Sequence, residues 1–237
     1  METVEKHYQD EKVVSKYEKK RFSSTGGQFV DQSEKEIILS LLKEEKPRKI
    51  LDLGAGTGRI SLLLAEEGYD VTSFDQSDEM LGTIEKKAKE GDLKISLIKG
   101  DAFNLPFEDN TFDSCISLRV LWHFKNPEKI MKEVQRVLKK DGTFIFDLLN
   151  KKSLRTPYAP IANSFVYTNL MSTKKMKETI NSSDLKIAKV KRFFIFPYAF
   201  YMCSPKPMAN LLKNLEKKLQ NTNSKKYSSV IYFKTKK

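Results

Sequence analysis

The chain has 237 residues, of which 39% are hydrophobic and 31% charged, a composition typical of a folded globular protein rather than a disordered one. No apolar run approaches the roughly 20 residues that a membrane-spanning helix needs, and two cysteines, Cys115 and Cys203, are too few for a disulfide framework or a cysteine-rich zinc site. The net charge of +12 is concentrated in residues 151–237, which carry 19 Lys and Arg against three acidic residues.

The distribution of charge bears on location and partners. Residues 1–20 are charged throughout and lack the apolar core of a secretory signal, so we expect a cytoplasmic protein. The basic C-terminal third predicts contact with an anionic membrane surface, a nucleic acid or a phosphorylated substrate. A face of solvated lysines would give the same sequence, so both interpretations stay open at this point.

Hydrophobic periodicity predicts alternating helices and strands over the first 150 residues. Ser33–Glu45 has the pattern of an amphipathic helix, with Ser33 and Glu36 as its capping box. Such alternation is typical of βαβ units around a parallel sheet. The elements expected next are strand 48–54, helix 58–68, strand 69–75, helix 78–90, strand 94–101, strand 112–120, helix 126–140 and strand 141–149.

The pattern changes after residue 150. Residues 151–169 have no clean period and contain Pro157 and Pro160, which predicts a loop or insertion. We find no internal repeat and no boundary between independently folding units, so we expect one domain over residues 1–237. The elements expected after the insertion are helix 171–184, strand 185–197, helix 207–220 and strand 227–235.

The segment ILDLGAGTGRIS places Gly54, Gly56 and Gly58 between a strand and a helix. Glycines there let a ligand approach the backbone, and the free N–H groups at the helix start favour negative charge. A phosphate-binding P-loop is excluded because the Gly-Lys-Ser/Thr ending is missing. A dinucleotide fingerprint is disfavoured because Arg59 stands where the third small residue is needed, and Asp75 at the end of the next strand is placed to accept both hydroxyls of a ribose.

With these motifs in this order, the chain resembles the class I S-adenosylmethionine-dependent methyltransferases, in the branch that contains the ubiquinone and menaquinone biosynthesis enzymes. ILDLGAGTG resembles the first family motif, VTSFDQSDEML the second, GDAFNLPFEDNTFD the third, and SLRVLWHFKNPEKIMKEVQRVLKKDGTFIF the fourth and fifth. The resemblance implies a Rossmann-like, doubly wound α/β fold with a mostly parallel seven-stranded sheet and inserts after strands five and six. It further implies an N-terminal helical lid over residues 1–32, a cofactor-binding core over 33–150, and substrate-side inserts with the last strands over 151–237.

The resemblance also implies a site for S-adenosyl-L-methionine, with Asp75 on the ribose and Asp101 on the adenine amino group. His123 is the candidate catalytic base for a phenol or enol proton, unless it only packs. No metal is expected. The implied cofactor-binding residues are Asp52, Gly54, Ala55, Gly56, Gly58, Asp75, Gln76, Met80, Asp101, Ala102, Phe103 and Leu118, and the implied acceptor-binding residues are Tyr8, Arg119, Trp122 and Tyr198.

The acceptor is expected to be a small or lipid-like molecule, bound by the lid and by the inserts 151–173 and 196–223. The aromatic run Phe194, Phe196, Tyr198, Phe200, Tyr201 and Met202 either forms a wall for a large apolar acceptor or belongs to the core. Lysines around it suit an anionic headgroup or membrane surface. Two alternatives stay open: a nucleic-acid methyltransferase that uses the basic C-terminal third, and a cofactor-binding domain without activity.

Overall fold

The computed structural model describes residues 21–43, 45–154, 156, 168–197, 200–201 and 203–237. Among these, no helix is both long and apolar enough to cross a bilayer. The elements in chain order are α3 (Thr25–Leu42), β1 (Lys49–Leu53), α4 (Arg59–Glu66), β2 (Asp70–Asp75), α5 (Asp78–Glu90), β3 (Ile95–Lys99), β4 (Phe112–Ser117), η1 (Leu121–His123), α6 (Glu128–Val137), β5 (Leu138–Asn150), β6 (Leu170–Met171), α8 (Thr173–Asn181), β7 (Lys186–Phe193), α10 (Lys206–Leu219), η3 (Asn223–Tyr227) and β8 (Val230–Lys236).

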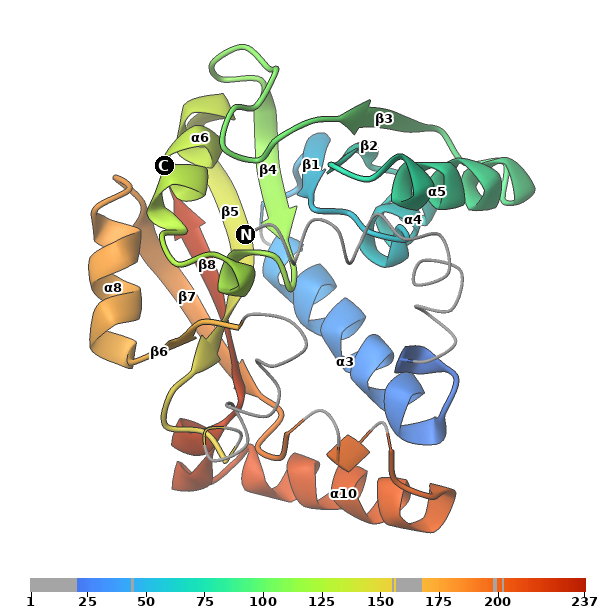
Figure 1. The fold of residues 1–237 in the computed structure, drawn as a ribbon, viewed down its shortest axis with the longest axis vertical. Helices are drawn as coiled ribbons and strands as arrows, with labels where there is room; N and C mark the ends of the chain where they lie inside the picture. Colours follow the sequence, from blue (N-terminus) through green and yellow to red (C-terminus); the bar gives the residue numbers. More distant parts are fainter. Residues whose placement is uncertain (1–20, 44, 155, 157–167, 198–199, 202) are drawn as a thin grey trace.

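A twisted sheet runs through the molecule in the order β3-β2-β1-β4-β5-β8-β7, with β6 paired beside β5 (Figure 1). The pairs from β3 to β5 are parallel, whereas β8 runs antiparallel to both β5 and β7. The predicted α/β fold with a mostly parallel sheet is therefore confirmed. The chain leaves β1 toward β2 on one side and reaches β4 on the other, so β1 and β4 flank the switch point where ligands bind in such sheets.

Two apolar cores cover the two faces of the sheet. Ile116 of β4 packs in the core that contains residues of α3, α4 and α10. Its neighbour Cys115 packs in the core that contains residues of α6 and α8. Adjacent strand residues point to opposite faces, so the helices of the two cores lie on opposite sides of the sheet.

The first described helix begins earlier than predicted. Thr25 is the first residue of α3, Ser24 is its N-cap, and the Ser24 hydroxyl accepts a hydrogen bond from the Gly27 N–H at 3.0 Å. The predicted capping box at Ser33 and Glu36 is wrong, since both lie inside this helix. Gly26 and Gly27 have low helix propensity, but a Cβ at Gly26 would meet the Tyr201 carbonyl at 1.7 Å, so tertiary contact fixes this end.

Two further elements differ from those expected from the sequence, because strand pairing and not hydrophobic periodicity determines where they lie. The predicted helix 126–140 ends at Val137, because Leu138 pairs with Phe112 and starts β5. The register then shifts so that Thr143 lies opposite Ser114. The two residues of β6 pair with β5, and so short a strand carries no period that a sequence pattern could reveal.

Candidate active site

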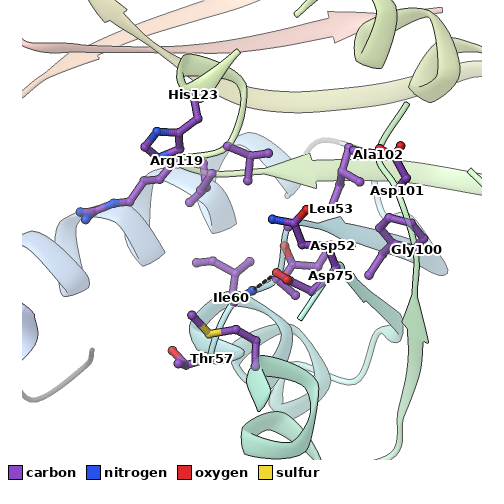
Figure 2. A pocket seen from close by; sticks show the side chains of 18 of the residues that line it. Asp52, Leu53, Thr57, Ile60, Asp75, Gly100, Asp101, Ala102, Arg119 and His123 are labelled. Atoms are coloured by element: carbon purple, nitrogen blue, oxygen red, sulfur yellow. Dashed lines mark hydrogen bonds between the residues drawn. The ribbon is translucent and has the colours of Figure 1, made fainter. Parts of the chain in front are cut away.

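A pocket opens at the C-terminal ends of β1, β2, β3 and β4 (Figure 2). Asp101 and Ala102 lie on one side of it and Arg119 and His123 on the other, with Asp75 between them. The residues predicted from the sequence that line this pocket are Asp52, Gly54, Ala55, Gly56, Asp75, Gln76, Met80, Asp101, Ala102, Phe103, Leu118, Arg119 and His123.

The three glycines after β1 have different reasons to be glycine, although all have positive φ. A Cβ at Gly54 would meet the Val120 side chain at 2.3 Å, and one at Gly58 would meet Ile84 at 2.8 Å. A Cβ at Gly56 would meet nothing within 4 Å, although Gly56 lines the pocket. Packing therefore explains Gly54 and Gly58, whereas at Gly56 the space stays open on the pocket side.

Asp75 ties the glycine turn to the end of β2. Its Oδ2 accepts a hydrogen bond from the Gly56 N–H at 2.8 Å (Figure 2). Its Oδ1 accepts one from the Ser77 N–H at 3.0 Å. Burial raises the pKa of Asp75, and these backbone donors work against the rise. Each carboxylate oxygen keeps further acceptor capacity, so Asp75 can also accept hydroxyls of a ligand in the pocket.

Asp52 lines the pocket and ends a buried chain of hydrogen bonds from two serine hydroxyls. The Ser61 hydroxyl donates to Asp52 Oδ2 at 2.6 Å, and the Ser73 hydroxyl donates to Ser61 at 2.7 Å. Burial raises the pKa of Asp52 to about 6, Asp75 adds to the rise, and the hydrogen bond from Ser61 opposes it. Nearby, the buried hydroxyl of Thr57 also lines the pocket and finds no hydrogen-bond partner among the described residues.

The turn after β3 forms the end of the pocket that lies away from Arg119 and His123. Asp101 Oδ1 accepts a hydrogen bond from the Phe103 N–H at 2.9 Å, which closes this turn. Phe103 meets Phe124 edge to face, with ring centroids 5.2 Å apart. Met80, from α5, is 2% exposed and adds an apolar wall. This end therefore combines an exposed carboxylate with flat apolar surfaces, which suits an aromatic ligand.

Comparisons with known proteins agree with this geometry. Residues 51–146 match the family model described as a methyltransferase domain. A demethylmenaquinone methyltransferase from Thermotoga maritima is 34% identical over 118 residues, which make up 49% of this chain and 50% of that protein. Over residues 51–146 the chain is thus similar to a methyltransferase domain. It spans about half the length of the curated relatives that it matches first.

Solved structures share the fold of this chain at low sequence identity. A SAM-dependent methyltransferase from Thermotoga maritima is 18% identical with a TM-score of 0.67, and the match covers 95% of this chain and 96% of that one. A geranyl diphosphate C-methyltransferase from Streptomyces coelicolor A3(2), in complex with S-adenosyl-L-homocysteine, is 12% identical with a TM-score of 0.69 over 88% of this chain and 80% of that one.

A buried ion cluster joins helix α3 to the wall of the pocket. Glu34 is fully buried and accepts hydrogen bonds from Arg59 at 2.8 Å and from Nε and Nη2 of Arg119 at 3.1 and 3.0 Å. The Tyr232 hydroxyl donates to the same carboxylate at 3.3 Å, and Asp31 pairs with the other side of Arg59. Both arginines line the pocket, so α3 fixes the wall opposite Asp101.

Arg119 is held in an unusual backbone conformation by Asp147 of β5. Arg119 has a φ of +62°, and its N–H donates to Asp147 Oδ1 at 2.8 Å. Asp147 Oδ2 is buried and has no hydrogen-bond partner among the described residues. Burial raises the pKa of Asp147 to about 7; the Glu34 carboxylate adds to the rise, and the Arg119 N–H opposes it. Asp147 is therefore a titratable group directly behind the pocket wall.

His123 lies on the same wall, at the end of η1. Its Nε2 accepts a hydrogen bond from the Trp122 indole N–H at 3.0 Å. Because indole only donates, a neutral His123 ring carries its proton on Nδ1. Trp122 itself is 5% exposed and is not among the pocket-lining residues, so in this geometry it orients His123 instead of lining the predicted acceptor site.

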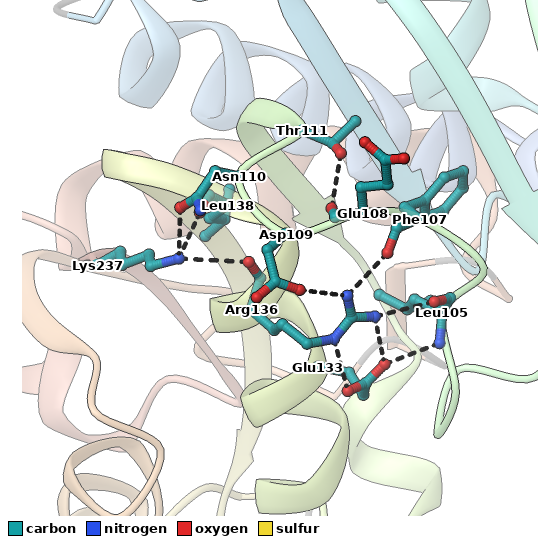
Figure 3. A network of polar contacts seen from close by, with 10 residues as sticks. All are labelled: Leu105, Phe107, Glu108, Asp109, Asn110, Thr111, Glu133, Arg136, Leu138 and Lys237. Carbon is teal, nitrogen blue, oxygen red and sulfur yellow. Dashed lines mark hydrogen bonds and ion pairs between the residues drawn. The ribbon is translucent and has the colours of Figure 1, made fainter.

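The loop between β3 and β4 is braced by Arg136 of α6 (Figure 3). The Arg136 guanidinium donates to the carbonyls of Leu105 and Phe107 at 2.9 and 2.8 Å. It also pairs with Asp109 and Glu133, and Glu133 in turn accepts from the Leu105 N–H at 2.9 Å. Since Leu105 follows the turn at residues 101–103, this network fixes the end of the pocket that carries Asp101.

Several predicted residues lie elsewhere or outside the described part. Gly58 does not line the pocket, because its place is set by backbone conformation and by Ile84. Tyr8, Tyr198 and Met202 lie outside the described residues. In the aromatic run, Phe194 and Tyr201 are fully buried against Phe29 in the core, and none of its described members lines the pocket. Of the two alternatives left open for this run, Phe194 and Tyr201 therefore follow the second: they belong to the core and pack against α3.

Sequence reasoning missed the residues that support the pocket from behind. Glu34, Asp147 and Arg136 act through contacts with residues far away in the chain, and Glu34 and Arg119 are 85 positions apart. One signal was present: Asp147 is a lone acid inside the apolar run FIFDLL. A carboxylate inside a buried strand needs a partner, and this one serves Arg119.

Proposed function

We propose that the chain is an S-adenosylmethionine-dependent methyltransferase that acts on a small or lipid-like acceptor. The observation that carries the proposal is the open space beside Gly56, whose N–H donates to Asp75 at the end of the neighbouring strand. A bound nucleoside uses both features, because the glycine lets it approach the backbone closely and the carboxylate accepts hydrogen bonds from the ribose hydroxyls.

The residues present fit this cofactor along its length. Asp75 would accept the ribose hydroxyls, and Asp101 with Ala102 and Phe103 would hold the adenine. Met80 would cover one face of the base, since its side chain is buried at the pocket wall. The further residues proposed to contact the cofactor are Asp52, Gly54, Ala55, Gln76 and Leu118.

The bound cofactor supplies an electrophilic methyl group, and the transfer needs orientation and closeness more than acid–base chemistry. The acceptor would enter beside Arg119 and His123, which line the wall opposite Asp101. The Glu34 ion pairs and the Asp147 contact keep that wall rigid. His123 is our candidate for taking an acceptor proton; to do so at Nε2 it must give up the hydrogen bond from Trp122.

The acceptor class rests on relatives and on the apolar pocket wall. The relative from Thermotoga maritima is named for demethylmenaquinone, and a structural neighbour for geranyl diphosphate. Both names denote acceptors with a prenyl chain, which supports a lipid-like acceptor here as well. We further propose peripheral contact with an anionic membrane, which is developed below.

Methyl transfer from isotope-labelled cofactor into a cell extract tests the proposal. We expect label in the solvent-extractable fraction of lipids and small molecules, and Gly56→Val should abolish it because the side chain fills the open space. Label in the RNA fraction would instead identify a nucleic-acid methyltransferase. Cofactor binding with no label in any fraction would identify a binding domain without activity.

A further inference from the structure

Helix α10 presents apolar side chains to solvent on the side away from the core. Ala209, Leu212 and Glu216 are its buried residues. Met208 and Leu211 are 48% and 51% exposed, and neighbouring turns of a helix bring residues three apart together. Phe200, shortly before the helix, is 47% exposed. Large apolar side chains that gather at one place on a surface mark an interaction site.

The exposed charges on this helix have one sign. Lys206, Lys217 and Lys218 are exposed, and Lys218 lies two turns from Leu211 on the same side. Between residues 203 and 227 the sequence contains one acid, Glu216. This carboxylate is buried and accepts hydrogen bonds from the Ile195 N–H at 2.9 Å and from the Tyr201 hydroxyl. The outer side of α10 is therefore basic and apolar at once.

This side lies one helix away from the pocket. α10 packs along α3 at the lower edge of the molecule in Figure 1. α3 in turn carries Glu34 and Asp31, which pair with Arg59 and Arg119 of the pocket wall. A surface that meets α10 is thus adjacent to the proposed acceptor side of the site.

We propose that the outer side of α10, formed by Lys206, Met208, Leu211, Lys217 and Lys218, docks on an anionic lipid bilayer. The inference rests on the proposed function, because a bilayer is where a lipid-like acceptor is found. Lysines next to half-exposed apolar residues match an interfacial helix, whose apolar side enters the headgroup region while its cations meet anionic lipids. Nucleic acid explains the lysines but not Met208 and Leu211, which have no flat face on which a base could stack.

Vesicle sedimentation of the full chain tests this surface. The vesicles are phosphatidylcholine with or without phosphatidylglycerol, at low and high salt, with no cofactor present. We expect salt-sensitive binding to the anionic vesicles. Each lysine near an anionic leaflet contributes roughly fivefold in affinity, so changing Lys206, Lys217 and Lys218 to Glu together should lower binding at least roughly 100-fold.

Two further variants separate this surface from general charge. Changing the exposed Lys86, Lys94 and Lys132 to Glu alters the net charge equally on other elements and should leave most of the binding intact. Changing Met208 and Leu211 to Gln should weaken binding at every salt concentration, because the apolar contribution is lost. Thermal melting of each variant verifies that it is folded.

The inference is overturned if wild type ignores anionic vesicles or if both lysine variants lose binding equally. It is also overturned if a structured RNA binds more tightly than the vesicles and depends on the α10 lysines. Titration of the same variants with S-adenosylhomocysteine keeps the two proposals apart. Failed vesicle binding with intact cofactor binding rejects the docking surface alone.

Discussion

Asp147→Asn should change how the stability of the protein depends on pH. Asp147 is fully buried, its ordinary pKa is 3.8, and burial raises the value in the folded protein to about 7. Between these two values the folded state keeps a proton that the unfolded state has released, so the free energy of unfolding falls as the pH rises. The asparagine variant has no proton to lose at this position, so it lacks this part of the pH dependence.

The size of the effect follows from the pKa shift. One pKa unit corresponds to about 1.36 kcal/mol. Relative to a low pH at which Asp147 is protonated in both the folded and the unfolded state, its ionisation therefore lowers the free energy of unfolding by roughly 1.7 kcal/mol at about pH 5 and by roughly 4 kcal/mol at about pH 8. The asparagine still accepts the Arg119 N–H, but its amide N–H₂ replaces a buried oxygen that has no hydrogen-bond partner among the described residues, so burying it carries a desolvation cost. That cost is independent of pH and cancels when the two pH values are compared.

Urea unfolding of both proteins at the two pH values measures this difference. We expect the variant to gain roughly 2–3 kcal/mol relative to wild type between about pH 5 and about pH 8. Asp92→Asn, on an exposed turn, removes the same charge and should follow wild type at both pH values. Equal effects of Asp147→Asn at the two pH values would refute the reasoning.

Three other predictions concern the walls of the pocket. Glu34→Gln leaves Arg59 and Arg119 without their shared buried counter-charge, so urea unfolding should give a loss of about 3–5 kcal/mol. Arg136→Ala releases the loop after β3 and should weaken S-adenosylhomocysteine binding by about 1–2 kcal/mol in calorimetry; unchanged affinity would show that the loop holds its place alone. His123→Asn should lower the rate of methyl transfer by roughly 10²-fold or more with unchanged cofactor affinity if His123 takes the acceptor proton; equal loss of both would point to packing.

The regular part of the fold could be predicted from the sequence because each element carries its own signal. The expected helix 78–90 matches α5 at both ends, where Ser77 caps the helix and Gly91 follows it. Elements defined by partners could not be predicted in this way. Leu138 belongs to β5 because it pairs with Phe112, and α3 begins at Thr25 because Tyr201 packs over Gly26.

The site divides along the same line. The residues that follow β1, β2 and β3 line the pocket as expected. Each of them comes directly after a strand within one of the sequence motifs, so the end of that strand sets its position. Gly54 and Gly58 were both assigned to a ligand; a Cβ at Gly54 would meet Val120 and one at Gly58 would meet Ile84, and only Gly54 also lines the pocket. The sequence cannot separate a glycine required by packing from one required by a ligand, because both needs exclude a side chain in the same way.

The central claim is that the space beside Gly56 receives S-adenosylmethionine. Calorimetric titration with S-adenosylhomocysteine, and with NAD for comparison, tests it on wild type, Gly56→Ala and Gly68→Ala. Gly56 and Gly68 both have positive φ and open space at the Cβ position, so the two variants carry the same kind of backbone strain, but only Gly56 lines the pocket. We predict that wild type and Gly68→Ala bind S-adenosylhomocysteine and not NAD, and that Gly56→Ala binds it at least roughly tenfold more weakly, a difference of about 1.4 kcal/mol. Binding of NAD alone, or equal affinities of the two alanine variants, would contradict the account.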